Sequence, residues 1–278
     1  MKELLLGNEA QIRLGFFIAI FALMASWELL APRRTGQIRR SLRWPSNLGI
    51  VVLNTLVVRL VMPTTAVGLA LSCEAAGWGL LQQMELALWS ACLLAIIALD
   101  LAIYLQHILF HAVPALWRLH RMHHADLAFD VTTGARFHPL EIILSMVIKL
   151  MVIAALGPPA VAVLIFEVVL NVLAMFNHAN AHLPLRLDRV LRHAIVTPDM
   201  HRVHHSIIPR ESNSNFGFNL SLWDRAFGTY CAQPAAGHQE MDIGIDQFRS
   251  EDELRLERML VQPFKGKGNS TYPINRQR

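Results

Sequence analysis

The sequence has few charged residues and very little lysine. Only 17% of its 278 residues are charged, against roughly a quarter in an ordinary soluble domain. So little charge cannot cover the surface of a soluble globule, and so apolar a chain is not a disordered one. Arginine supplies nearly all of the positive charge, because only four of the 25 basic residues are lysine.

Cysteine is scarce as well. The three cysteines, Cys73, Cys92 and Cys231, lie far apart and form no C-x-x-C pair, so we expect free thiols and no disulfide framework. The sequence also lacks the G-x-G-x-x-G, C-x-x-C-H and iron–sulfur cysteine motifs. It therefore carries none of the common motifs for binding a nucleotide cofactor, a covalent haem or an iron–sulfur cluster.

Hydrophobic residues are abundant, at 54% of the chain with a mean hydropathy of +0.37. They are concentrated in long runs, which is typical of an integral membrane protein. Three runs predict long spans, and two shorter ones, joined by Gly157-Pro158-Pro159, predict a helical hairpin. The second run is interrupted by Arg59 and Pro63. The five runs cover residues 14–31, 48–71, 86–110, 142–156 and 160–176.

The net charge is +4. The distribution of the charged residues between the loops predicts how the chain is oriented in the membrane. Five arginines fall within residues 33–43, whereas residues 72–85 contain two glutamates and no lysine or arginine. Because positive loops stay in the cytoplasm, we expect the first loop inside and the second outside. The histidine clusters and the C-terminus then all lie on the cytoplasmic side. No basic run is interleaved with aromatic residues, so nucleic acid is not an expected partner.

Histidine is the most unusual component of the sequence. Twelve of the 13 histidines lie between His107 and His205, and ten of them form two H-x-x-x-H and two H-x-x-H-H clusters. Positions i, i+3 and i+4 share one face of a helix, so each cluster points its imidazoles in one direction. Ten imidazoles exceed the needs of one ion, and no Glu-x-x-His pair of a carboxylate-bridged bundle occurs. We predict a histidine-rich site for two metal ions with these ligands: His107, His111, His120, His123, His124, His178, His182, His201, His204 and His205.

Three further residues are candidates for the catalytic site. Asp100 and Tyr104 continue the helical stripe of His107 and His111 into the third span, and Asp199 precedes the last cluster. Ligand imidazoles usually donate their second N–H to a carboxylate or carbonyl oxygen. We therefore expect Asp100, and as a second candidate Asp199, to orient a ligand. The alternative for Asp100 is a contact with Arg59 across the spans.

The remaining titratable residues have less specific interpretations. His138 is either an auxiliary ligand or a cap before the hairpin, whereas His193 and His238 are expected at the surface. Lys149 and Glu167 either pair with one another or flank a lipid channel. The arginines near the clusters either meet an acidic electron donor or a lipid headgroup, or anchor the loops: Arg118, Arg121 and Arg202.

Six motifs of the sequence belong together: Asp100-x-x-x-Tyr104-x-x-His107-x-x-x-His111, Trp117-Arg-Leu-His120-Arg-Met-His123-His124, Phe137-His138-Pro139-x-Glu141, His201-Arg-Val-His204-His205, Asn215-Phe216-Gly217 and Trp223-Asp224-Arg225-x-Phe227-Gly228-Thr229. In this combination the chain resembles the fatty acid hydroxylase/sterol desaturase superfamily, and within it the bacterial-type sterol desaturases. The resemblance implies a transmembrane region at 1–93, a catalytic domain at 94–231 and a soluble C-terminal tail at 232–278. The expected fold is an all-α membrane bundle of three long spans and a hairpin, with a cytoplasmic helical cap that carries the metal site.

The resemblance also implies a function. Members of this superfamily use a di-iron centre and O2 to hydroxylate or desaturate lipids such as sterols and fatty acyl chains. Their electrons come from a separate cytochrome b5-like or ferredoxin-like donor, which agrees with the absence of electron-carrying motifs here. Two alternatives are a membrane metal carrier or sensor, with histidines along a pore, and a di-haem electron carrier, with isolated histidines in facing spans.

Overall fold

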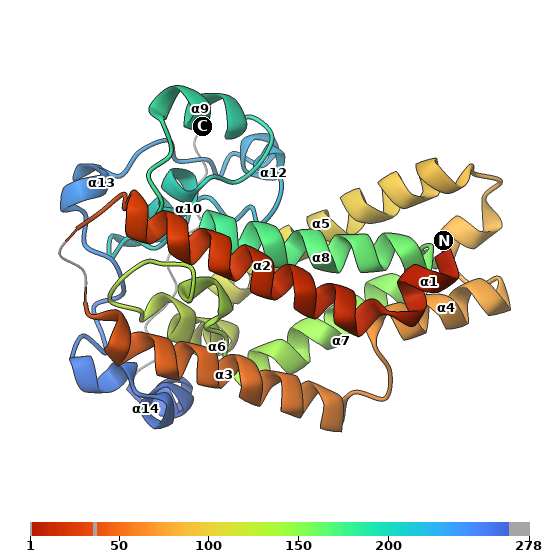
Figure 1. The fold of residues 1–278 in the computed structure, drawn as a ribbon, viewed down its shortest axis with the longest axis horizontal. Helices are drawn as coiled ribbons and strands as arrows, with labels where there is room; N and C mark the ends of the chain where they lie inside the picture. The colour runs from red at the N-terminus through yellow and green to blue at the C-terminus, as the bar shows by residue number, and fades with distance from the viewer. Residues whose placement is uncertain (1, 36–37, 267–278) are drawn as a thin grey trace.

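The computed structural model describes residues 2–35 and 38–266, and this part of the chain is helical, with isolated bridges and no strand. Long helices form the body of the molecule and run nearly side by side (Figure 1). The long helices are α2 Glu9–Leu30, α3 Arg40–Val61, α5 Leu88–Ala112, α7 Pro139–Leu156 and α8 Ala160–Asn177, and the shorter α1 Lys2–Gly7 and α4 Ala66–Ala76 lie among them.

The long helices have the length and composition of membrane spans. Five segments qualify, at 9–30, 40–83, 88–112, 139–156 and 160–177. Their large apolar side chains point outward, as Leu30 and Leu60 do with 86% and 85% of their surface exposed. An apolar surface of this kind is stable in contact with lipid chains and unfavourable in contact with water. The chain is therefore a multi-pass membrane protein, and the expected all-α bundle of three long spans and a hairpin is confirmed.

The second predicted span is interrupted near Pro63, as the sequence indicated. Helix α3 ends at Val61, the chain turns through Pro63, and Thr65 caps α4 by accepting a hydrogen bond from Gly68 N at 2.9 Å. Proline has no backbone N–H to donate to a helical hydrogen bond, so the helix cannot continue through Pro63. Helix α4 then packs against α7 and α8, and the single predicted segment is two helices.

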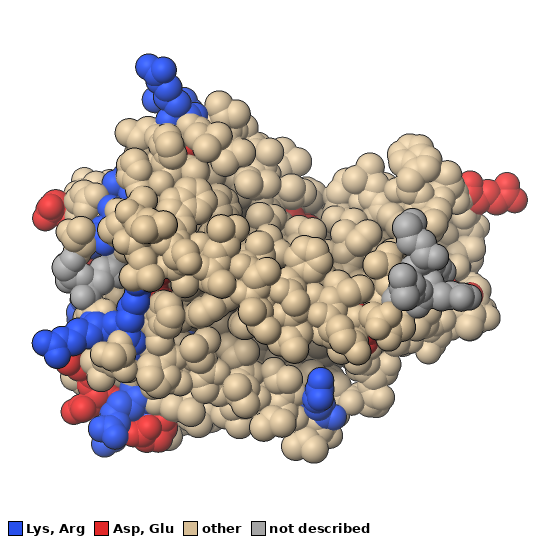
Figure 2. All heavy atoms as spheres, in the orientation of Figure 1, with Lys and Arg blue, Asp and Glu red and all other residues tan. Residues whose placement is uncertain are grey.

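Short helices form a cap at the left end of the bundle (Figure 1). The predicted arginine-rich loop lies at this end too, because Arg33 and Arg43 contact residues of the cap. Figure 2 shows lysine and arginine gathered there, whereas the middle of the visible face has almost no charge. The cap elements are α6 Pro114–His124, η2 Thr133–Ala135, α9 Leu185–Leu191, α10 Pro198–His204, α11 Pro209–Ser212, α12 Leu222–Ala226, α13 Gly237–Glu240, η3 Glu251–Leu254, α14 Leu256–Val261 and η4 Gln262–Phe264; η1 Leu80–Gln83 lies at the other end.

Residues 232–266 are part of the cap and pack against α3 and α6. Met259 of α14 is fully buried in one cluster with Ile50 of α3 and Met122 of α6. Arg121 is buried, and its guanidinium donates to Gln262 O at 2.6 Å and to Lys265 O. The charged composition of this segment is the reason why the sequence predicted a tail. Its few apolar residues are enough to fix it against the helix that carries three of the histidines.

Candidate metal centre

Nine of the ten predicted ligands come together in two groups at the cap end of the bundle. All nine are buried, and within each group the possible ligand atoms lie within 4.8 Å of one another. We call the groups site A and site B. Site A consists of His107, His111, His120, His124 and His204; site B consists of His123, His178, His201 and His205.

Local sequence explains how the helices deliver these side chains. Helix α5 ends at Ala112, and Pro114 begins α6 at the position where its missing N–H costs nothing. The chain therefore turns sharply, and the imidazoles of α6 face those of α5. Thr197 caps α10 by accepting from Met200 N at 3.4 Å, with Pro198 in the first turn.

The hydrogen bonds of site A turn its Nε2 lone pairs inward. His107 Nδ1 lies 2.8 Å from Phe216 O, and His204 Nδ1 lies 2.7 Å from Ser214 O. A carbonyl oxygen only accepts, so each Nδ1 carries the hydrogen and each Nε2 keeps its lone pair. The same holds for His120, whose Nδ1 donates to the Glu141 carboxylate at 2.7 Å.

The Nε2 lone pairs of His107 and His120 point toward one another. Nε2 of His107 and Nε2 of His120 are 3.1 Å apart, and with both protons on Nδ1 they cannot form a hydrogen bond. Nε2 of His204 and Nε2 of His111 are buried with no hydrogen-bond partner among the described residues. Converging, unpaired imidazole nitrogens are what a cation requires, so the donor set of site A fits a bound metal ion.

Site B follows the same pattern. His178 Nδ1 donates to Ala174 O at 2.8 Å, and its Nε2 lies 3.3 Å from Nε2 of His123 and 3.1 Å from Nε2 of His201. The sites adjoin, because the rings of His124 and His205 stack with centroids 4.6 Å apart. The nine imidazoles therefore divide into five at site A and four at site B.

Six of the grouped imidazoles outside the spans are held neutral. Burial lowers the pKa of His178 to about 4 and that of His204 to about 3. Burial, with neighbouring imidazoles adding to it, lowers the pKa further below its usual value in His123, His124, His201 and His205. A neutral imidazole is the form that binds a metal, so at neutral pH these ligands need lose no proton.

His182 does not join either group, and the sequence-based expectation is wrong here. Helix α8 ends at Asn177 with His178 as its cap, so the spacing of four residues no longer places His182 one turn further along a helix. Its side chain is exposed. Its backbone N–H instead donates to Ala31 O at 2.8 Å, which ties the segment to the end of α2.

Asp100 and Tyr104 are buried on the inner face of α5, and both bind residues of the cap. Oδ2 of Asp100 accepts from Trp223 Nε1 at 2.8 Å and from Leu220 N at 3.3 Å. The Tyr104 hydroxyl lies 2.8 Å from Thr229 Oγ1, and its ring stacks on Phe227. Neither Asp100 alternative, an oriented imidazole or Arg59, is observed. Both residues fasten the 213–230 segment to α5.

Asp199 also has different partners from those expected. It accepts from Arg33 Nε at 3.0 Å and forms an ion pair with Arg202, and His238 Nε2 lies 3.6 Å from Oδ2. His238 is therefore buried, contrary to the expected surface position. Arg202 and Arg121 are buried as well, so neither offers its charge to a partner on the surface.

The structure gives partners to three other residues whose interpretation was open. His138 caps α7, because its Nδ1 accepts from Leu140 N at 3.2 Å, while Nε2 binds Leu260 O. Lys149 Nζ pairs with Glu167 Oε1 at 2.8 Å. Arg13 binds the other oxygen of Glu167 at 2.8 Å, so this intramembrane carboxylate has two cationic partners. His193 is exposed, as expected.

Sequence reasoning missed the residues that orient the ligands. Glu141 was noted only as part of a motif, and the carbonyl oxygens of residues 214 and 216 have no signature of their own. Asp224 shapes their loop by accepting from the N–H groups of Phe216 and Gly217 at 2.8 Å. A Cβ at Gly217 would lie 2.7 Å from Asp224 Oδ2, so only glycine lets the carboxylate approach. Burial raises the pKa of Asp224 to about 6.

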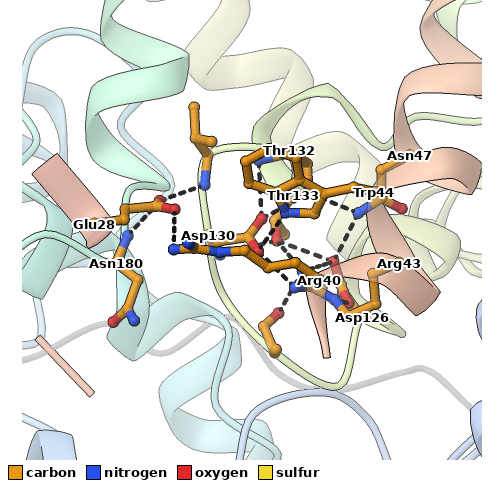
Figure 3. A network of polar contacts seen from close by, with 12 residues as sticks. Glu28, Arg40, Arg43, Trp44, Asn47, Asp126, Asp130, Thr132, Thr133 and Asn180 are labelled. Carbon is orange, nitrogen blue, oxygen red and sulfur yellow. Dashed lines mark hydrogen bonds and ion pairs between the residues drawn. The ribbon is translucent and has the colours of Figure 1, made fainter. Parts of the chain in front are cut away.

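A buried ionic network holds the segment that covers site B (Figure 3). Arg43 of α3 donates to both oxygens of Asp126, at 2.7 and 2.6 Å, and to Asp130 at 2.6 Å. Arg43 and Asp126 are completely buried. The segment they fix carries Phe129 and leads to Phe137, which stacks on His123 with ring centroids 4.5 Å apart.

An apolar cavity of about 170 Å³ lies beside site A. His107 and His120 form its metal end, and from there it follows α7 past Ser145 to Lys149. Apart from these residues, Gln106 and Glu141, its wall is apolar: Ile103, Phe110, Phe137, Ile142, Met146, Leu170 and Phe218. A cavity of this kind suits an alkyl chain lying next to the histidines.

Comparisons with known proteins agree with this geometry. Ornithine lipid hydroxylase OlsE of Rhizobium tropici is 30% identical over 176 residues, which cover 63% of this chain and 50% of that protein. Alkylglycerol monooxygenase of Xenopus tropicalis is 29% identical over 49% of this chain and 30% of its own length. Cholesterol 25-hydroxylase of Rattus norvegicus is 26% identical over 53% of this chain and 49% of its own.

The chain thus spans half or less of the length of these relatives. No solved structure matches it at a significant level. The profile of the fatty acid hydroxylase family matches residues 92–229, which contain both metal sites and the loop that orients their ligands. The narrower assignment to the sterol desaturases stays a prediction. The chain belongs to the fatty acid hydroxylase family.

Proposed function

We propose that this protein is a membrane-bound oxygenase that hydroxylates or desaturates a lipid with O2 and two iron ions. One observation carries the proposal: nine buried imidazoles form two adjoining sites, and one of these opens onto an apolar cavity within the membrane bundle. The family relationship supports it, since the named relatives are hydroxylases and monooxygenases of lipids.

The iron ions, when bound, supply the activation of O2 for attack on a C–H bond. The chain supplies everything around them. Sites A and B hold the ions through neutral imidazoles, and Glu141 and the carbonyl oxygens of the 213–230 segment fix the rings. Phe137 and Phe110 line the space next to the ligands, which keeps water from the reacting carbon and leaves room for an alkyl chain.

A separate protein is the proposed source of electrons, either cytochrome b5-like or ferredoxin-like. The chain has no electron-carrying motif, and the two sites lie at the end of the bundle where the arginine-rich loop also lies. By the positive-inside rule this end, with the C-terminus, faces the cytoplasm. The buried Arg121 and Arg202 do not serve as the docking surface.

The lipid itself is a proposal at the level of its class. The relatives' names mention an ornithine lipid, an alkylglycerol and cholesterol, all of which combine an apolar body with a polar group. We propose a sterol, fatty acyl or related lipid whose apolar part occupies the cavity. A metal carrier or sensor is less favoured, because the histidines lie together at one end and do not line a path through the bundle.

The test uses purified protein in lipid nanodiscs, loaded with Fe(II) and supplied with a reductant, O2 and extracted membrane lipids. Mass spectrometry should find products shifted by +16 or −2 mass units, absent without iron or without O2. Products that form equally well without either would exclude the proposal. Uptake of metal into vesicles without any lipid oxidation would favour the carrier.

A further inference from the structure

The apolar wall of the cavity contains one pair of uncharged polar side chains. Gln106 of α5 donates from Nε2 to Ser145 Oγ of α7 at 2.8 Å, and both residues line the cavity. The amide oxygen, Oε1 of Gln106, is buried and has no hydrogen-bond partner among the described residues. A buried acceptor without a donor is unfavourable, so this oxygen calls for a ligand that can donate.

The pair lies one helical turn from the metal end of the cavity. Glu141, which binds His120, and Ser145 are four residues apart on α7, which corresponds to about 6 Å along the helix axis. Gln106 directly precedes His107 of site A. A group held by this pair would therefore lie close to the carbon that faces the metal ions.

The charge around the cavity decides between a neutral and an anionic group. Lys149 is the cationic residue of the wall, one turn beyond Ser145. Its ammonium group already pairs with Glu167 at 2.8 Å. An anion would have to compete with that buried carboxylate, whereas a neutral donor would satisfy Gln106 without disturbing the ion pair.

We infer that Gln106 and Ser145 form a binding site for the hydroxyl group of a lipid alcohol whose chain lies in the cavity. The hydroxyl donates to Oε1 of Gln106, and Ser145 holds the amide in place by accepting from its Nε2. The inference rests on the proposed function, since it specifies the lipid that the cavity takes and places its hydroxyl near the site of oxidation.

Binding can be measured without turnover in the iron-loaded protein, kept in nanodiscs under anaerobic conditions. The probes are hexadecan-1-ol, its methyl ether and hexadecanoic acid, each with a photoreactive diazirine on the chain, and labelling is quantified by mass spectrometry. The ether keeps the oxygen but cannot donate. The alcohol should reach half-maximal labelling at a concentration about tenfold lower than the ether, as one hydrogen bond predicts.

Substitutions show which residues cause the preference for the alcohol over the ether. Gln106→Leu should remove the preference for the alcohol over the ether, and Ser145→Ala should reduce it. Gln83→Leu, the same kind of substitution at an exposed position at the other end of the bundle, should leave it unchanged. If Gln106→Leu fails to fold or to hold iron, two other results test the inference. These are the effect of Ser145→Ala and the ratio of half-maximal labelling concentrations for alcohol and ether in the unaltered protein.

Equal labelling by alcohol and ether would overturn the inference. So would preferred labelling by the acid that disappears in Lys149→Met, because the wall would then bind an anion. The experiment is separate from the test of function. A preference for the alcohol without any oxidised product in air would leave the hydroxyl site standing and refute the oxygenase.

Discussion

The Glu141 carboxylate lies 2.7 Å from Nδ1 of His120, and this bond directs the other ring nitrogen toward His107. Removing such a partner of a ligand typically costs 10–100-fold in metal affinity. We expect Glu141→Ala to weaken metal binding at site A by roughly that factor, and Glu141→Gln, which keeps an acceptor, to weaken it less. The measurement is iron per chain during titration with a chelator. The exposed Glu251→Gln is the control; equal retention in all three variants would contradict the role of Glu141.

Substitutions of His178 and His182 should differ in their effect on iron content. His178→Ala removes a ligand of site B and should lower the iron content by about one ion per chain, whereas His182→Ala should leave it unchanged, because this side chain is exposed and outside both sites. Elemental analysis of the two purified variants, with folding checked by circular dichroism, compares them directly. Loss of iron from His182→Ala alone would reverse the assignment.

The difference between these two histidines shows what residue spacing alone does not predict, namely where a helix ends. Helical spacing correctly predicted which faces of α5, α6 and α10 carry histidines, because those clusters lie within or at the end of a helix. His178 and His182 have the same spacing as His107 and His111, but α8 ends at Asn177, so only the cap residue His178 stays next to the helix. Where a helix ends is set by tertiary contacts as much as by sequence, such as the bonds from Asn177 to Phe218 O and from Asn180 to Arg34 O.

The partners of the ligands were still harder to predict. Asp100 has the right spacing on α5, yet its carboxylate binds Trp223, more than a hundred residues later in the sequence. Glu141 belongs to another helix than the histidine it orients, and the carbonyl oxygens of Ser214 and Phe216 come from a loop. Periodicity describes one element at a time, and these contacts join several.

Asp100 offers a direct check of that correction. In Asp100→Asn the side-chain oxygen can still accept from Trp223, so iron content should remain near that of the unaltered protein. In Asp100→Leu the indole N–H of the half-buried Trp223 loses its acceptor, which costs about 1–3 kcal/mol of stability. Iron analysis and the midpoint of thermal unfolding distinguish the two effects. Loss of iron in Asp100→Asn at unchanged stability would restore the role as orienting residue.

Arg43 is the centre of the network over site B. Its removal leaves two buried carboxylates without their main partner, because Asp126 and Asp130 both bind it. We expect Arg43→Met to lower the free energy of unfolding by about 3–5 kcal/mol. Thermal unfolding in detergent or nanodiscs measures this. Arg255→Met, which breaks an exposed ion pair with Glu257, should be close to the unaltered protein, and a similar loss in both variants would contradict the importance of burial.

Gly134 tests whether the covering segment also positions a ligand. A Cβ at this position would lie 2.8 Å from Ala174 O and 3.0 Å from Nδ1 of His178. These are the two partners of the hydrogen bond that fixes the His178 ring. Gly134→Ala should therefore displace His178 and lower iron occupancy at site B, leaving about one ion per chain.

The matched control for this substitution is Gly15→Ala, in the middle of α2, where a Cβ would meet nothing within 4 Å. Alanine is the better helix former by about 1 kcal/mol, so this variant should be as stable as the unaltered protein or more so, with full iron content. Full iron content in Gly134→Ala would mean that the segment can move away from α8 without disturbing the ring. The geometry of site B would then be set by α6, α8 and α10 themselves, and the network of Arg43 would stabilise the fold without positioning a ligand.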